Sequence, residues 1–202
     1  MSKIKILFNI IFVLLVVNAT QAQRFNFSLV AGLNAAQVNG DGLAGYDKLG
    51  LVAGGKTNIF FSERIDMTVE FLYSQQGSAS EATFSGNNAI FNLDMDYLEL
   101  PVGIEIKDWL AEGDDKYYKV RFGLGLSYGR VFRLESTQNF GETFKTDDFK
   151  FKGSIMYFLN RHVGFALRYT RSIIPLERIE EQGRTVGVIP HHISIMAQYS
   201  FL

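Results

Sequence analysis

Three glutamates, Glu70, Glu99 and Glu105, are the residues of this 202-residue chain best suited to acid–base chemistry. Two facing carboxylates can act as general acid and general base, so Glu70 could pair with Glu99 or Glu105. Lysines and arginines follow the same alternating pattern, however, and no nucleophile motif accompanies them. Mixed charges of this kind are typical of a buried salt-bridge network. We therefore expect no enzyme, and we predict a network of Lys56, Glu70, Glu99, Glu105, Lys119, Arg121 and Arg168.

The histidines and aspartates offer little for a metal ion. His191 and His192 are adjacent, so in a strand they point to opposite faces, and His162 is the only other histidine. Asp94 and Asp96 could bind a hard cation together with loop oxygens, but a solvated strand end explains them as well. The chain has no cysteine, P-loop, Gly-x-Ser-x-Gly or His-Glu-x-x-His motif. We expect no metal and no cofactor.

Composition narrows the protein class. A net charge of −1 argues against nucleic-acid binding, which requires a basic excess. The 14% aromatic content is high, but the 47% hydrophobic residues are too diluted by polar ones for a bundle of membrane helices. The length fits one domain.

Residues 1–22 have the pattern of a signal peptide. Lys3 and Lys5 precede an apolar run at 10–17, and Thr20 and Ala22 supply small residues for cleavage after Ala22. An uncleaved membrane anchor is the alternative, but the run is shorter than the ~20 apolar residues that a spanning helix needs. The domain division is thus 1–22 for the signal peptide and 23–202 for the exported domain.

Eight segments of the exported part alternate between apolar and polar residues, the period of a β-strand. They lie near 25–34, 48–61, 65–74, 97–106, 118–129, 149–157, 163–170 and 192–201. Leu93 and Met95 are out of phase with the fourth segment, which predicts a bulge near Asp96. Such alternation fits either a soluble barrel or a membrane barrel, whose faces are inverted.

Three features favour the membrane barrel. Long connections at 36–47, 75–92, 134–148 and 172–190 alternate with short ones at 62–64 and 160–161, with 107–116 of intermediate length. Most strand glycines fall on the polar face, which suits a narrow lumen. Aromatic residues gather towards both ends of the strands, as in membrane girdles. The predicted girdle comprises Phe25, Phe27, Phe61, Tyr73, Tyr118, Tyr128, Tyr157, Tyr169, Tyr199 and Phe201.

The predicted fold class is therefore all-β: an eight-stranded antiparallel transmembrane up-and-down β-barrel with long extracellular loops and short periplasmic turns. Three motifs resemble the PorT-like outer-membrane β-barrel family of Bacteroidetes: Ala-Gly-Leu-Asn at 31–34, Glu-Phe-Leu-Tyr-Ser-Gln-Gln-Gly at 70–77 and Tyr-Leu-Glu-Leu-Pro at 97–101. The chain also ends in a strand with Tyr199 and Phe201, although its last residue is Leu202 rather than an aromatic. The resemblance implies an outer-membrane barrel, and the founding member of that family is linked to type IX protein secretion.

We expect a non-enzymatic barrel of the cell outer membrane, with a lumen filled by side chains and a structural or loop-mediated interaction role. The alternative is a transport role, either as a PorT-like accessory of type IX secretion or as a small porin-like pore. Expected partners are outer-membrane lipid, the barrel-assembly machinery during biogenesis and a protein bound through the extracellular loops.

Overall fold

A computed structural model describes residues 25–39, 45–80, 92–112, 116–136, 145–181 and 184–201. They form nine strands: β1 Phe25–Asn39, β2 Lys48–Phe60, β3 Ile65–Ala79, β4 Asn92–Leu110, β5 Tyr118–Ser136, β6 Asp147–Phe158, β7 Val163–Ser172, β8 Glu177–Glu181 and β9 Arg184–Ser200. The described residues include no helix that is both long and apolar enough to cross a membrane.

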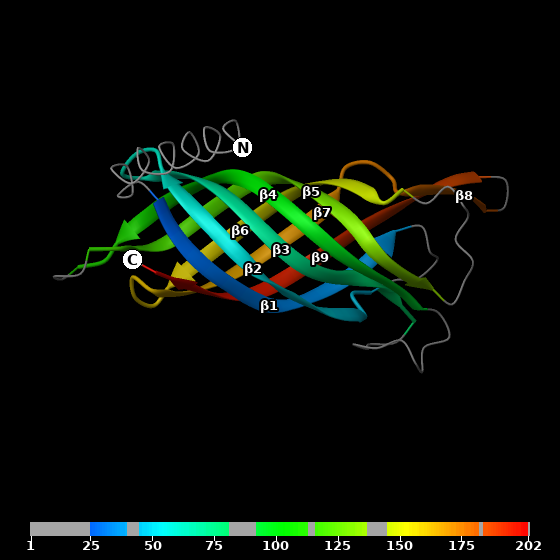
Figure 1. Cartoon of the computed structure of the whole chain (residues 1–202), viewed down its shortest axis with the longest axis horizontal. Coiled ribbons are helices and arrows are strands. Elements are labelled where there is room, and N and C mark those ends of the chain that lie inside the picture. Colours follow the sequence, from blue (N-terminus) through cyan, green and yellow to red (C-terminus); the bar gives the residue numbers. More distant parts are fainter. Residues whose placement is uncertain are drawn as a thin grey trace, which may run out of the picture.

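Eight of these strands close into an antiparallel barrel (Figure 1). Each strand from β1 to β7 pairs with the next, β7 pairs with β9, and β9 returns to β1 through a ladder that runs from Ser28 opposite Ser200 to Asn39 opposite Ile189. Because the number of strands is even, β1 starts and β9 ends at the same end of the barrel, here called the terminal end; the opposite end is called the loop end. The predicted eight-stranded barrel is confirmed.

The strands extend further towards the loop end than the alternation predicted. β1 continues to Asn39, β3 to Ala79 and β5 to Ser136. The predicted connection at 172–190 contains β8, which pairs with the first residues of β9 as a hairpin beyond the barrel wall. Alternation fades in these sections because they no longer separate an apolar outer face from a polar inner one, whereas backbone pairing continues.

The irregularity near Asp96 is confirmed, but its cause differs from the one predicted. Asp96 lies opposite Arg133 and Tyr97 lies opposite Val131, so the extra residue is Phe132, on β5. Strand β4 itself keeps its phase, and its Leu93, Met95 and Tyr97 side chains are all buried inside. Leu93 and Met95 broke the expected pattern because the lumen is apolar at this level.

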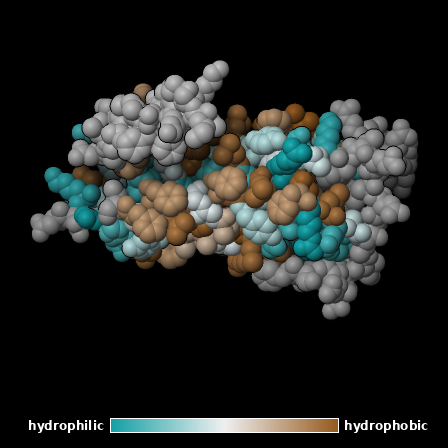
Figure 2. Space-filling model, in the orientation of Figure 1, coloured by the Kyte–Doolittle hydropathy of each residue, from teal (hydrophilic) through white to brown (hydrophobic). Residues whose placement is uncertain are grey.

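The two faces of the barrel are inverted relative to a soluble protein. Outward side chains are apolar and exposed, as at Leu124 and Ile195, whose exposed fractions are 62% and 65%. Figure 2 shows brown, apolar side chains along the barrel wall. Inward side chains are buried, and most of them are polar or charged. This arrangement is that of a barrel surrounded by lipid.

Candidate functional site

The lumen holds the charged side chains that the sequence singled out. Six of the seven predicted network residues point inward and are at most 8% exposed, because strand alternation places every second side chain inside. These six are Lys56, Glu70, Glu99, Glu105, Arg121 and Arg168. They fall into four clusters along the barrel, each with partners from strands that are not neighbours in the sheet.

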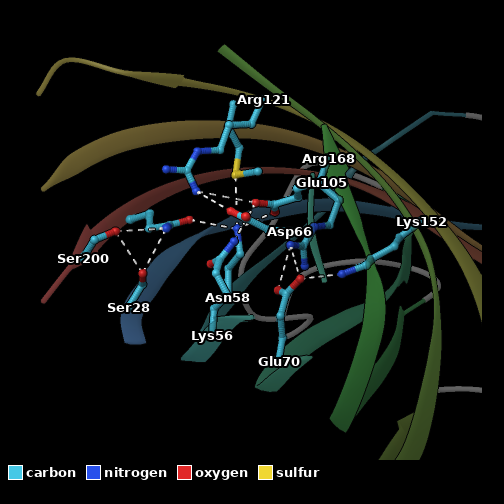
Figure 3. Close-up of polar contacts among 12 residues, drawn as sticks. Ser28, Lys56, Asn58, Asp66, Glu70, Glu105, Arg121, Lys152, Arg168 and Ser200 are labelled. Atoms are coloured by element: carbon cyan, nitrogen blue, oxygen red, sulfur yellow. Dashed lines mark hydrogen bonds and ion pairs between the residues drawn. The ribbon is translucent and has the colours of Figure 1, made fainter. Parts of the chain in front are cut away.

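The first cluster, which we call the Glu70 cluster, joins strands β3, β6 and β7 (Figure 3). Arg168 Nη2 donates to both Glu70 carboxylate oxygens, at 2.9 Å and 2.7 Å, and Lys152 Nζ donates to Oε1. β3 and β7 are four strands apart in either direction around the barrel. The Glu70–Arg168 ion pair therefore crosses the whole diameter of the lumen.

The second cluster lies nearer the terminal end. Lys56 Nζ donates to Glu105 Oε1 at 2.5 Å and to the Gln198 side-chain oxygen at 3.2 Å, while Asn58 donates to Glu105 Oε2 at 3.0 Å. Lys56 Nζ also lies 3.4 Å from the sulfur of Met156 on β6, again four strands from β2. This cluster thus connects β2, β4, β6 and β9 through the bore.

The third cluster lies towards the terminal end of the barrel. Lys107 Nζ donates to Asp66 Oδ1 at 2.7 Å. Arg121 is held less closely: its Nη1 lies 3.7 Å from Asp66 Oδ2 and 3.9 Å from Glu105 Oε2, and its Cζ lies 4.3 Å from the centre of the Phe158 ring. Arg121 is therefore surrounded by opposite charge and an aromatic face without a close hydrogen-bonded partner.

The fourth cluster lies towards the loop end. Lys150 Nζ donates to Glu99 Oε1 at 2.6 Å and to Gln76 Oε1 at 2.9 Å. The same ammonium lies 3.6 Å from the centre of the Tyr97 ring, whose hydroxyl donates to Asp148 at 3.3 Å. A charge over an aromatic face inside a low-dielectric lumen is a favourable contact.

Apolar side chains fill two further sections of the interior. One cluster, named here the outer plug, lies at the loop end and consists of Val38, Leu93, Met95, Tyr97, Val131, Leu176 and Val188. Another lies among the charged clusters and consists of Val30, Val52, Leu72, Met156, Phe158, Ala166 and Met196. The bore is therefore occupied by alternating apolar and charged groups.

Lys119 is the predicted network residue that these clusters do not include. It is half-buried near the start of β5, and its ammonium lies 5.2 Å from the centre of the ring of Trp109, which is 59% exposed. At the rim of the barrel a long lysine side chain can reach an outer aromatic face and water instead of a buried partner. The alternation predicted that Lys119 faces the lumen, but it could not predict that the side chain lies at the rim.

Sequence reasoning missed Lys107, Lys150 and Asp148 as members of the network. Lys150 and Lys107 have the same strand parity as Lys152 and Glu105, so the alternation carried the signal for both. Lys107 had been expected in a turn because the length of β4 was underestimated. Nothing in the sequence pairs Asp148 with Tyr97, since that contact depends on the shape of the lumen.

The arrangement does not place the glutamates as a catalytic pair. Glu70, Glu99 and Glu105 each accept from a different lysine, namely Lys152, Lys150 and Lys56. The carboxylates are thus separately neutralised, which is the arrangement of a salt-bridge network.

The histidines and paired aspartates also lie apart. His192 is inside, whereas His191 packs edge-on against Tyr46 with ring centres 5.2 Å apart, and His162 lies at the terminal end, 2.9 Å from the Ser200 carbonyl oxygen. The described part of the chain contains no group of three or more metal-ligating side chains close enough to hold an ion.

Asp94 and Asp96 each already face a cation. Asp94 forms an ion pair with Lys48, and Asp96 lies 3.7 Å from Arg133 Nη1. Asp96 is only 9% exposed, so the expected solvated strand end is in fact packed. Its neighbours on β3 and β5 cover it because these strands extend beyond the predicted ends.

The predicted girdle residues face outward. Eight of them are between 37% and 83% exposed, namely Phe25, Phe27, Phe61, Tyr128, Tyr157, Tyr169, Tyr199 and Phe201. Tyr73 and Tyr118 are half-buried. Some contact one another, as Phe27 does Phe201, with ring centres 6.0 Å apart. Aromatic rings towards the two ends of the barrel wall suit the two membrane–water interfaces, and the tyrosines among them also carry a polar hydroxyl.

Comparisons with known proteins agree with this geometry. Residues 18–178 match the model of the family described as outer membrane protein beta-barrel domain. The fold is similar to that of Ail, the attachment invasion locus protein of Yersinia pestis, with a TM-score of 0.51 and 14% identity over 87% of this chain and 98% of that chain. Neisserial surface protein A gives a TM-score of 0.48 and 11% identity over 88% of this chain and 97% of that chain. No curated protein sequence matches. At these identities the similarity concerns the fold alone.

Proposed function

Because the chain belongs to the outer membrane protein beta-barrel domain family and its barrel is an outer-membrane barrel, we propose that it is a non-enzymatic protein with a closed lumen that acts through the segments at its loop end. The barrel supplies a rigid support in lipid, and the connections between its strands supply the interaction surface. Binding residues commonly occur on loops held by such a scaffold.

The ion pair between Glu70 and Arg168 is the observation that carries this proposal. It joins opposite walls of the barrel, so it occupies the position that a continuous channel would need. An eight-stranded barrel has an interior only wide enough for side chains, and here the outer plug occupies the loop end of the same bore. A large solute would have to break several buried contacts to pass.

A conductance measurement tests the proposal. The purified barrel, inserted in planar bilayers, should give no stable, porin-like conductance above that of bilayers treated with detergent alone. A stable, large conductance of the wild-type protein would contradict the closed lumen. It would favour the transport alternative, either as a small pore or as an accessory of type IX secretion.

We also infer that residues 1–22 are removed during export and that the barrel-assembly machinery inserts residues 23–202. Lys3, Lys5, the apolar run and the Thr20/Ala22 site support this inference. N-terminal sequencing of the protein from an outer-membrane fraction should begin at Gln23. A mature protein that starts at Met1 would refute cleavage.

A further inference from the structure

A basic pocket opens at the terminal end of the barrel, on the side opposite the proposed interaction surface. It has a volume of about 360 Å³ and is lined by Phe60, Lys107, Lys116, Tyr117, Tyr118, Arg121 and Arg161. These residues come from the ends of β2 and β4, the connection before β5, the first part of β5 and the turn between β6 and β7. Four of the seven are cations, and none is acidic.

Two of these cations, Lys107 and Arg121, lie inside the barrel near carboxylates. Lys107 donates to Asp66 at 2.7 Å, whereas Arg121 approaches Asp66 and Glu105 no closer than 3.7 Å. Lys116 and Arg161 are exposed at the rim. The lining itself therefore contributes four positive charges and no negative one.

The Arg121 guanidinium has donors that can bind a further acceptor. It is 8% exposed, and its Nε and Nη1 have no hydrogen-bond partner among the described residues. Buried donors of this kind are costly to leave unpaired, so they are expected to be satisfied by a ligand or by water. Because Arg121 lines the pocket, an anion entering from the terminal end would meet these donors.

An apolar cluster lies next to Arg121. The Arg121 Cζ lies 4.3 Å from the ring of Phe158, which is 1% exposed and belongs to an apolar cluster against which Tyr117 packs. Apolar surroundings strengthen the attraction between Arg121 and an anion, because the local dielectric is low.

We propose that this pocket binds a phosphate group presented from the terminal side of the barrel. A phosphate carries up to two negative charges and several acceptor oxygens, which match the cations of the lining and the donors of Arg121 better than a single carboxylate would. The pocket is larger than a phosphate ion, so the rest of the ligand can contact Phe60, Tyr117 or Tyr118. The phosphate belongs either to a soluble molecule or to a phospholipid head group.

The test uses inorganic pyrophosphate as the probe and isothermal titration calorimetry as the readout. The full-length mature barrel is kept in a maltoside detergent, whose head group carries no phosphate. Wild-type protein should show saturable binding that weakens with added salt. Arg121→Met should weaken binding about tenfold, since a hydrogen bond to a charged group is lost.

Two further variants keep the test independent of folding. Lys116→Gln and Arg161→Gln replace exposed rim residues, so they should fold normally, and each should weaken binding about threefold. Arg130→Gln is the matched control, because Arg130 is an exposed cation towards the loop end. Absence of saturable binding, or equal loss in Arg130→Gln, would overturn the proposal.

Lipid composition distinguishes the two sources of phosphate. The titration is repeated in maltoside micelles that contain phosphatidylglycerol or, at equal negative charge, oleate, which carries no phosphate. If phosphatidylglycerol suppresses pyrophosphate binding by wild-type protein more than oleate does, the site takes a lipid head group. If the two additives have the same effect, the site takes a soluble phosphate.

Discussion

Replacing Glu70 by glutamine should destabilise the barrel strongly. Glu70 is 1% exposed and accepts from Arg168 at 2.9 Å and 2.7 Å and from Lys152. Glutamine keeps the shape but removes the negative charge, which leaves two buried cations close together. Breaking a buried ion pair from one side costs about 3–5 kcal/mol. We expect a loss of that size in the free energy of unfolding.

The assay is urea unfolding of protein reconstituted in lipid vesicles, followed by fluorescence of Trp109, the only tryptophan. Glu135→Gln is the matched control, because Glu135 accepts from Arg133 at 2.8 Å but both side chains are 58% exposed. It should leave the free energy of unfolding unchanged, since water screens exposed pairs. Comparison of the two variants isolates the effect of burial.

A third variant separates charge from packing. Glu70→Leu combined with Lys152→Met and Arg168→Met replaces the cluster by apolar side chains of similar volume, which is often neutral or stabilising. It should therefore recover most of the stability that Glu70→Gln loses. A loss below about 1 kcal/mol in Glu70→Gln, or a triple variant as unstable as the single one, would refute the reasoning.

Three other substitutions test the outer face, the outer plug and the backbone, each by the same urea titration. Leu124→Arg should cost about 2–4 kcal/mol and Leu124→Ala clearly less, because Leu124 faces lipid and charge is expensive near the membrane centre; equal stability of the two variants would contradict the outward assignment. Leu176→Ala should cost about 2–5 kcal/mol because Leu176 is 1% exposed in the outer plug, and an unchanged stability would mean that the plug adds nothing. Gly77→Ala should cost about 1–3 kcal/mol, since Gly77 has φ +148° and an added Cβ would collide with the Leu93 carbonyl oxygen; wild-type stability would show that this backbone relaxes freely.

The alternation of side chains was sufficient to predict the barrel, because lipid outside and a narrow lumen inside impose period two on every spanning strand. The outward direction of Leu124 and the inward direction of Arg121 follow from their odd or even spacing along β5 alone. Strand ends were harder to predict. Beyond the membrane region of the barrel no lipid face exists, so nothing in the sequence marks where β5 stops or where β8 pairs with β9.

The candidate site was predictable as a set of residues but not as a set of contacts. Parity placed Glu70 and Arg168 in the lumen, whereas their pairing depends on which strands face each other after closure. Parity was equally unable to distinguish Lys119 at the rim from Lys56 deep inside. The basic pocket escaped prediction because its four cations come one each from β4, the connection before β5, β5 itself and the turn between β6 and β7.

The contacts across the lumen also determine how the chain can fold. Arg168 is 98 residues from Glu70, Gln198 is 142 residues from Lys56 and Ser200 is 172 residues from Ser28. The first pair therefore meets only after β7 is in place, and the other two pairs meet only when β9 closes the barrel. A half-formed barrel would hold Glu70 without its arginine and would leave the edges of β1 and β4 open. Folding of this chain should therefore be highly cooperative and slow, as is usual when most contacts are distant in sequence, and a fragment that ends after β4 should not form a stable half-barrel.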